Sequence, residues 1–202
     1  MNKTHITGVI LAGGRATRMG GRDKGLVKLN SKYMIEHVIT ALRPQVGQLL
    51  ISANRNLEQY AQLSDCPVLA DTFGHYDGPL AGMATALANA QTDYVLFAPC
   101  DSPFISSQLA ERLYTRLIQT NADASVADDG SRIHPVFSLL KRSLLADLMA
   151  FLKTEERSIR RFLAQLPLLT KADFSDNAET FLNINTFEER DNCEYALKKE
   201  SL

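Results

Sequence analysis

The amino-acid sequence predicts an α/β protein, a three-layer αβα sandwich around a mostly parallel, Rossmann-like sheet. Short apolar runs suited to buried strands recur at 9–11, 49–51 and 94–98, and segments with helical spacing of apolar residues separate them. The first run leads directly into a glycine-rich loop. Strands that alternate with helices favour parallel pairing through right-handed crossovers, so the carboxyl ends of the strands are expected to meet at one edge of the sheet.

The N-terminal half follows this alternation in order. A helix is expected over 31–42, where apolar residues recur at helical spacing and Pro44 closes the segment. The segment 94–98, Tyr-Val-Leu-Phe-Ala, is the most continuously apolar run and is therefore expected at the centre of the sheet. The other expected elements of this half are strand 49–51, helix 57–63, strand 67–71 and helix 81–90.

The C-terminal half predicts more helices and a hairpin. Two strands, 122–127 and 133–140, flank the turn residues Asp128-Asp129-Gly130. In a strand Asn183 and Asn185 would share one face, and Thr186-x-x-Glu189 is the capping box of a final helix. Amphipathic or apolar spacing predicts the remaining helices at 106–120, 143–153 and 158–166.

Length and composition exclude several classes of protein. At 202 residues the chain suits one α/β domain. The net charge of −1 gives no global field for nucleic acid, and no apolar run approaches the roughly 20 residues of a membrane helix. Three distant cysteines without a CxxC pair predict neither disulfides nor a zinc site, and they suit a reducing cytoplasm, as does the lack of a signal peptide.

The loop after the first strand is the segment richest in chemical signal. Gly13-Gly14 and Gly20-Gly21 let the backbone approach a ligand closely, and successive N–H groups in such loops bind anions. The P-loop pattern is absent because Leu26 follows Gly25 where lysine would be required. Cations are dense here, which predicts a nucleoside triphosphate as ligand; they are Arg15, Arg18, Arg22, Lys24 and Lys28.

Polar residues follow several of the predicted strands. The ends at 12–14, 52–55 and Asp71 are distant in sequence but are expected to converge in space. Asp101 follows the central strand, where a carboxylate suits Mg²⁺ that also binds substrate phosphates. The alternative is that Asp101 only caps the next helix, although Ser106 is already a candidate for that role.

The segment Leu11 to Lys24 resembles the signature loop of nucleotidyltransferases. Its Asp23-Lys24 pair is similar to the form of this loop in the molybdenum cofactor guanylyltransferases. Sugar and isoprenoid relatives usually read Pro-Lys there. The likeness continues through GPLAGM, PCDSP and FLNINTFEE, from Val9 to Glu189. It implies Arg18, Lys24 and Asp101 as catalytic residues, with Mg²⁺ on Asp101. The implied nucleotide site consists of Leu11, Ala12, Gly13, Gly14, Gly21, Lys24, Ser52, Asn54, Asp71, Gly78 and Asp101.

The resemblance also implies an acceptor site built from Asn183, Asn185 and His134, with an N-terminal part at about 1–104 for the nucleotide and a C-terminal part at about 105–190 for the acceptor. Residues alone leave alternatives open. A lone histidine is more often structural, two asparagines can be a plain polar strand face, and Gly78-Pro79 can be ordinary turn punctuation. The basic residues Arg157, Arg160 and Arg161 either line the acceptor's path or form a solvated helix face.

The implied reaction transfers GMP from GTP to the terminal phosphate of molybdopterin and releases pyrophosphate. The acceptor phosphate is itself the nucleophile, so no Ser, Cys or His nucleophile is required. Transient contacts with cofactor-assembly proteins or molybdoenzyme apoproteins are expected. The rival hypotheses are a cytidylyl- or sugar-nucleotide transferase on the same fold, and a non-catalytic carrier of nucleotide or cofactor.

Overall fold

The central sheet has seven strands in the order β5-β4-β1-β6-β8-β7-β9, in a computed structural model that describes residues 1–13, 21–73 and 78–200. Its members are β1 Ile6–Leu11, β4 Gln48–Ser52, β5 Val68–Leu69, β6 Tyr94–Pro99, β7 Ala124–Asp128, β8 Ile133–Lys141 and β9 Leu169–Asp173. The pairs β4–β5, β1–β4, β1–β6 and β7–β9 are parallel, whereas β8 runs antiparallel to both β6 and β7. The mostly parallel sheet predicted from the sequence is confirmed.

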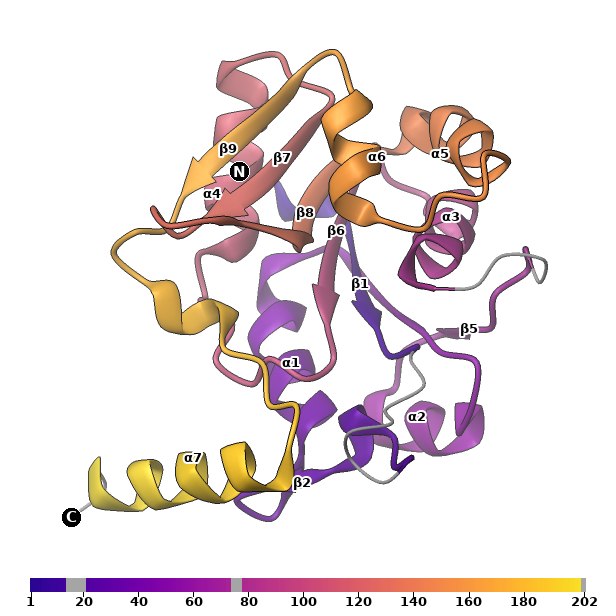
Figure 1. Ribbon diagram of the computed structural model, residues 1–202. Coiled ribbons are helices and arrows are strands. Elements are labelled where there is room, and N and C mark those ends of the chain that lie inside the picture. The colour runs from indigo at the N-terminus through magenta and orange to yellow at the C-terminus, as the bar shows by residue number, and fades with distance from the viewer. Residues whose placement is uncertain (14–20, 74–77, 201–202) are drawn as a thin grey trace.

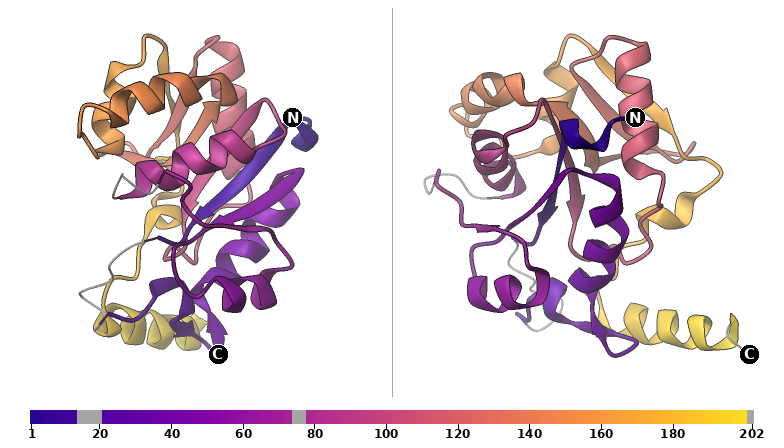
Figure 2. Two further views of the ribbon diagram at one scale, coloured as in Figure 1. Left: turned by 90° about the vertical axis from the view of Figure 1, so that its right-hand side faces the viewer. Right: turned by 180° about the vertical axis from the view of Figure 1, so that it is seen from behind.

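Helices cover both faces of this sheet, which gives the predicted three layers (Figures 1 and 2). On one face α1 Met34–Leu42 and α4 Leu109–Gln119 bury their apolar stripes. On the other face lie α3 Pro79–Asn89, α5 Leu145–Leu152 and α6 Ile159–Gln165. Strand β1, which is buried throughout, and β6, which is buried except at its two end residues, are sandwiched between these layers, as expected for the centre of a parallel sheet.

The sheet edge and the C-terminus carry smaller elements. A short helix, α2 Leu57–Ser64, connects β4 to β5. The two-stranded hairpin of β2 Lys28–Leu29 and β3 Lys32–Tyr33 stands apart from the main sheet. The last helix, α7 Phe187–Glu200, extends along the lower edge of Figure 1, away from the sandwich.

The structure corrects several boundaries. The helix expected from residue 31 begins at Met34, because the preceding residues form the β2–β3 turn with positive φ at Asn30 (48°) and Ser31 (70°). The helices expected from 106 and 143 begin at Leu109 and Leu145. Strand β9 was missed, because its buried positions Thr170 and Ala172 are too small and polar to form an apolar pattern.

One prediction about an element was wrong. Residues 182–185 form no strand, although the capping box that follows is present: Glu189 N–H donates to Thr186 Oγ1 (3.1 Å), and Glu189 Oε2 accepts from Thr186 N–H (3.2 Å). Ile184 instead donates its N–H to the carbonyl of Asp101 (2.9 Å). This backbone bond, together with side-chain bonds to Asn183 and Asn185, holds the segment without a strand partner.

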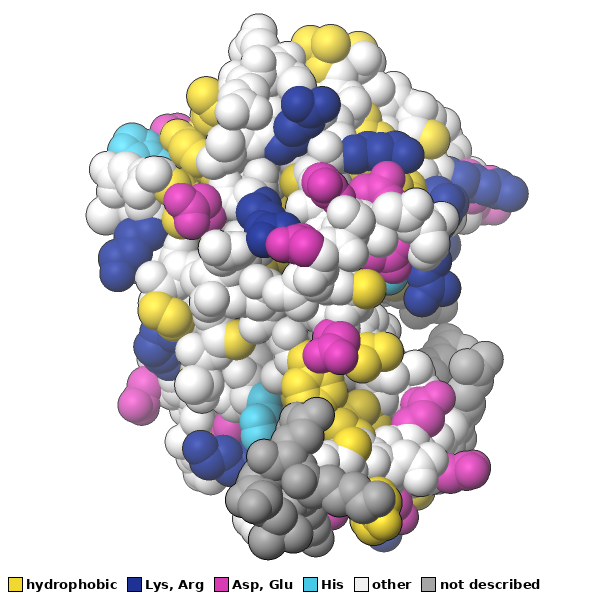
Figure 3. All heavy atoms as spheres, turned by 90° about the vertical axis from the view of Figure 1, so that its left-hand side faces the viewer, with side chains coloured by type: hydrophobic (Ala, Val, Ile, Leu, Met, Phe, Trp, Pro, Cys, Tyr) yellow, Lys and Arg dark blue, Asp and Glu magenta, His cyan; other side chains and the backbone are white. Residues whose placement is uncertain are grey.

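Charge is mixed over the surface. On the face shown in Figure 3, the coloured basic and acidic side chains are interspersed, and no continuous basic area is visible there. This agrees with the net charge of −1. Among the described residues, no helix combines the length and the hydropathy that crossing a bilayer requires.

Candidate active site

Two adjoining pockets open at the carboxyl ends of β1, β4, β5 and β6. The first, which we call the strand-end pocket, has a volume of about 290 Å³ and is lined by Leu11, Ala12, Gly13, Asp23, Lys24, Arg55, Pro79, Pro99, Cys100, Asp101 and Val136. The second, the side pocket, has a volume of about 590 Å³ and is lined by Leu11, Gly13, Ser52, Asn54, Arg55, Asp71, Gly78, Pro79, Gly82 and Arg157. Four residues belong to both linings, so the pockets form one continuous site.

Lys24 is the central cation of the strand-end pocket. Its ammonium donates to Asp101 Oδ2 at 2.8 Å and to Asn185 Oδ1 at 2.5 Å. The three residues come from the glycine loop, the end of β6 and the segment before α7, and only the fold brings them together. Asp101 is 6% exposed and lies well before α4, which begins at Leu109, so it is no cap of that helix.

The segment that carries Asn185 is held against the end of β6 by several bonds. Ile184 is bonded to Asp101 through the backbone, and the hydroxyl of Ser102 donates to Asn183 Oδ1 at 2.5 Å. Ile184 is buried in a small apolar cluster with Val27, Leu29 and Met34. The two asparagines therefore face the same end of β6 even without a strand.

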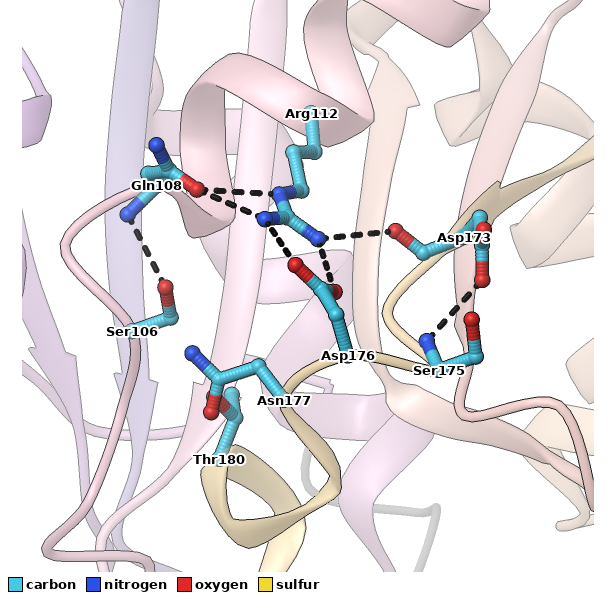
Figure 4. A network of polar contacts seen from close by, with 8 residues as sticks. All are labelled: Ser106, Gln108, Arg112, Asp173, Ser175, Asp176, Asn177 and Thr180. Carbon is cyan, nitrogen blue, oxygen red and sulfur yellow. Dashed lines mark hydrogen bonds and ion pairs between the residues drawn. The ribbon is translucent and has the colours of Figure 1, made fainter.

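Earlier in the chain, Arg112 of α4 binds the turn that leads from β9 toward this segment (Figure 4). Its guanidinium forms two bonds to the carboxylate of Asp176 (2.5 and 2.8 Å), one to the carbonyl of Asp173 (3.3 Å) and two to Gln108. The hydrogen bond from Arg112 holds the pKa of Asp176 below its usual range. The network fixes the turn between β9 and the residues that approach the pocket.

Asp71 and Asn54 form a rigid pair in the side pocket. Asn54 Nδ2 donates to Asp71 Oδ2 at 2.7 Å, and the backbone N–H of Asp71 donates to Asn54 Oδ1 at 2.9 Å. The other carboxylate oxygen, Oδ1, is buried without a hydrogen-bond partner in the described part of the protein. Because a buried acceptor without a partner costs about 1–3 kcal/mol, this oxygen marks a place for a donor from a ligand.

Gly82 in α3 makes room in the same pocket. A Cβ atom at this position would lie 2.5 Å from Ser52 Oγ and 3.4 Å from Asp71 Oδ1. Any larger residue would therefore displace the polar groups that line the pocket. A glycine in the interior of a predicted helix is the sequence signal for such a close approach, and sequence reasoning assigned Gly82 no role.

His134 lies on β8 and lines neither pocket, although Val136 of the same strand lines the strand-end pocket. Its Nε2 is 2.6 Å from Asp129 Oδ2, and its ring stacks on Phe181 at 4.1 Å. Hydrogen bonds from Ser131 and His134 hold the pKa of Asp129 well below its usual range. These contacts match a structural histidine, and its predicted acceptor role stays a prediction.

Of the residues predicted for the nucleotide, nine line the two pockets: Leu11, Ala12, Gly13, Lys24, Ser52, Asn54, Asp71, Gly78 and Asp101. Gly14 and Arg18 lie outside the described residues. Gly21 has a positive φ of 78°, and its carbonyl accepts from Arg55 Nη1 (3.1 Å). Arg55, at the end of the predicted 52–55 segment, lines both pockets, and Arg157, one of the three arginines whose role the sequence left open, lines the side pocket.

The donor set fits a hard cation. Asp101 supplies one carboxylate and Asn185 one amide oxygen beside it, and Mg²⁺ usually takes one or two carboxylates together with substrate phosphates. Nowhere in residues 1–13, 21–73 and 78–200 do three or more His, Cys, Asp or Glu side chains gather as a metal cage. Cys100 is buried, which raises the pKa of its thiol and makes it a packing residue, not a nucleophile.

Solved structures share this fold. Molybdopterin-guanine dinucleotide biosynthesis protein A from Archaeoglobus fulgidus superposes with a TM-score of 0.80 at 22% identity, over 96% of this chain and 99% of that one. 4-Diphosphocytidyl-2C-methyl-D-erythritol synthase from Anaerococcus prevotii gives 0.72 at 11% identity, over 98% and 100%. At these identities the likeness shows the fold alone.

The family follows from the sequence itself. The chain belongs to the MobA-like NTP transferase domain family, whose model matches residues 8–170. It is also 45% identical over 192 residues to the molybdenum cofactor guanylyltransferase of Shewanella loihica, an alignment that covers 95% of this chain and 97% of that relative. The protein is therefore a nucleotidyltransferase, as the glycine loop and the Asp23-Lys24 pair predicted.

Proposed function

We propose that this protein transfers GMP from GTP to the terminal phosphate of molybdopterin, forming molybdopterin guanine dinucleotide and pyrophosphate. The observation that carries the proposal is the Lys24–Asp101–Asn185 cluster, which lies beside a pocket with an unpaired carboxylate oxygen on Asp71. The first feature suits a triphosphate and the second suits a base. The 45% identity to a molybdenum cofactor guanylyltransferase supports the choice of nucleotide and acceptor.

Asp71 is proposed to read the guanine base. Guanine presents an N1–H and an N2–H₂ side by side, and both are donors to a carboxylate. Cytosine presents an N4–H₂ donor beside the acceptor N3, which a carboxylate repels. Asn54 bonds both the carboxylate and the backbone N–H of Asp71, so turning the carboxylate away to relieve a mismatch would break the bond from Asn54 Nδ2 to Oδ2.

Lys24 is proposed to hold the triphosphate and to stabilise the pyrophosphate as it leaves, with Arg18 in the same role. Mg²⁺ held by Asp101 would neutralise phosphate charge when bound. An oxygen of the acceptor phosphate then attacks the α-phosphorus in line, and the bond from the α-phosphorus to the pyrophosphate oxygen breaks. Positioning and charge neutralisation suffice for such a displacement, so this chain contributes no covalent nucleophile.

The acceptor is proposed to lie on the side of the cluster where Asn183 and Asn185 face the end of β6. This assigns the nucleotide to the part of the chain up to about residue 104 and the acceptor mainly to the part that follows. His134 would act on the acceptor only indirectly, because its ring stacks on Phe181, two residues before Asn183. Delivery of the product by transient contact with a molybdoenzyme apoprotein stays a prediction.

The test is pyrophosphate release with Mg²⁺, comparing GTP with CTP, each with and without molybdopterin. Release only with GTP and molybdopterin is the expected result. An Asp71→Asn variant should lose the preference for GTP over CTP, because an amide presents a donor as well as an acceptor; the matched control is Asp123→Asn, outside both pockets. Release with CTP alone would point to a cytidylyltransferase, and GTP binding without any release would point to a carrier.

A further inference from the structure

Asp23, the residue before Lys24, is an acidic side chain beside a site for a polyanion. It lines the strand-end pocket, yet its side chain is only 4% exposed. A carboxylate in this place lowers the positive potential that attracts phosphate, so its presence needs a physical reason. The reason lies in its partners.

Three residues in α2 or just before it hold the Asp23 carboxylate. The hydroxyl of Tyr60 donates to Oδ1 at 2.5 Å, and Asn56 Nδ2 donates to Oδ2 at 3.0 Å. Arg55 Nε lies 3.3 Å from Oδ2 as an ion pair, and its Nη1 reaches the carbonyl of Gly21. Gly21 and Asp23, which lie just before Lys24, are thereby fastened to α2 and to the two residues that precede it.

Tyr60 is the deepest of these partners. It is fully buried, and burial strongly raises the pKa of its phenol, with further contributions from Cys100 and Asp23, so the hydroxyl stays a donor. It also presses against the loop after Lys24: a Cβ atom on Gly25 would lie 2.6 Å from Tyr60 Oη and 3.3 Å from Cys100 Cβ. One hydroxyl therefore contacts the residues that precede and follow Lys24.

We propose that Tyr60 and Asp23 are positioning residues that aim the Lys24 ammonium at the phosphates. The pair fixes the backbone of the short helical turn at Lys24–Leu26, so that the lysine side chain crosses the pocket toward Asp101 and Asn185. Arg55 neutralises Asp23 and leaves the field of Lys24 available to the ligand. The inference rests on the proposed function, in which Lys24 binds the triphosphate.

The sharpest variant is Tyr60→Phe, which removes one oxygen and keeps the buried ring. Asp23 then keeps Asn56 and Arg55, so the loop is loosened and not released. Asp23→Asn is a poorer test, because its amide group would place a donor against the donors of Asn56 and Arg55. Tyr94→Phe is the matched control, since Tyr94 begins β6 at the opposite end from Asp101 and packs edge-on against Tyr114 at 5.3 Å.

The measurement is calorimetric binding of GTP and of guanosine, with melting temperatures recorded for each variant. We expect Tyr60→Phe to weaken GTP binding about tenfold, the order expected for one lost hydrogen bond to a charged group, and to change guanosine binding by less than about twofold. In a Lys24→Met background, Tyr60→Phe should add less than about twofold to the loss of GTP affinity. Tyr94→Phe should bind both ligands as the wild type does.

Three results would overturn the inference: equal losses for GTP and guanosine, an unchanged GTP affinity, or a full additional loss in the Lys24→Met background. Each would mean that Tyr60 supports the fold in general or not at all, and would leave the guanylyl transfer itself intact. A wild-type protein that binds GTP no more tightly than guanosine would instead refute the phosphate role of Lys24 and this inference with it.

Discussion

Replacing Asp101 by asparagine distinguishes the contribution of this side chain to stability from its contribution to catalysis. The substitution keeps the shape of a side chain that is 6% exposed and removes its charge. Breaking a fully buried ion pair costs about 3–5 kcal/mol. Lys24 has a quarter of its side chain exposed and keeps its bond to Asn185, so we expect a loss of only about 1–2 kcal/mol in the free energy of unfolding.

The effect on catalysis should be much larger. The carboxylate is the proposed anchor of Mg²⁺, and loss of one preorganised electrostatic contact to a developing charge typically costs about 10²–10³ in rate. We therefore expect kcat for pyrophosphate release from GTP and molybdopterin to fall by about 10³, while the melting temperature falls by only about 2–8 °C.

Kinetics and thermal unfolding of the same preparation measure both numbers. Asp123→Asn is the control. Asp123 forms an ion pair with Lys141 (3.0 Å) and lines neither of the two pockets, so this variant should lose stability without losing rate. A variant at Asp101 with kcat within about threefold of the wild type would refute the assignment of this carboxylate to the reacting phosphates.

Two further predictions test other parts of the structure. Gly82→Ala should raise KM for GTP about tenfold, because its Cβ would lie 2.5 Å from Ser52 Oγ; adding Ser52→Ala should recover most of the loss in steady-state assays, and no recovery would contradict the steric explanation. Asp176→Asn should lower the melting temperature near pH 7. Because Arg112 lowers the folded-state pKa of Asp176, its contribution is present above the unfolded pKa near 4 and is lost as pH falls through the folded value. The melting-temperature difference between wild type and variant should therefore shrink toward pH 3, and a difference that grows there would contradict this sign.

The sequence by itself determined the fold class and the neighbourhood of the site. Apolar runs and helical spacing are local properties, so the alternation of strands and helices was readable without a structure. The rule that parallel strands collect ligands at their carboxyl ends then placed Gly13, Ser52, Asp71 and Asp101 together, and all four line the two pockets.

Only the tertiary structure decided which side chains touch. Lys24 and Asn185 are 161 residues apart, and their contact depends on how the chain returns past the end of β6. The same return of the chain also explains why residues 182–185 form no strand. A strand requires a partner strand, whereas this segment is bonded to Asp101, Ser102 and Lys24, none of which offers it a strand edge. The local sequence pattern indicates the secondary structure that a segment favours, whereas tertiary packing decides whether a strand partner is available to it.

The role of Asp23 shows the same division most clearly. In the sequence it is one acid among cations, and it indicated only a branch of a family. In the fold it lies against Tyr60, which is 37 residues away and buried in α2. No spacing or composition reveals such a pair, because hydrogen bonds between distant side chains are set by three-dimensional packing and not by the order of residues.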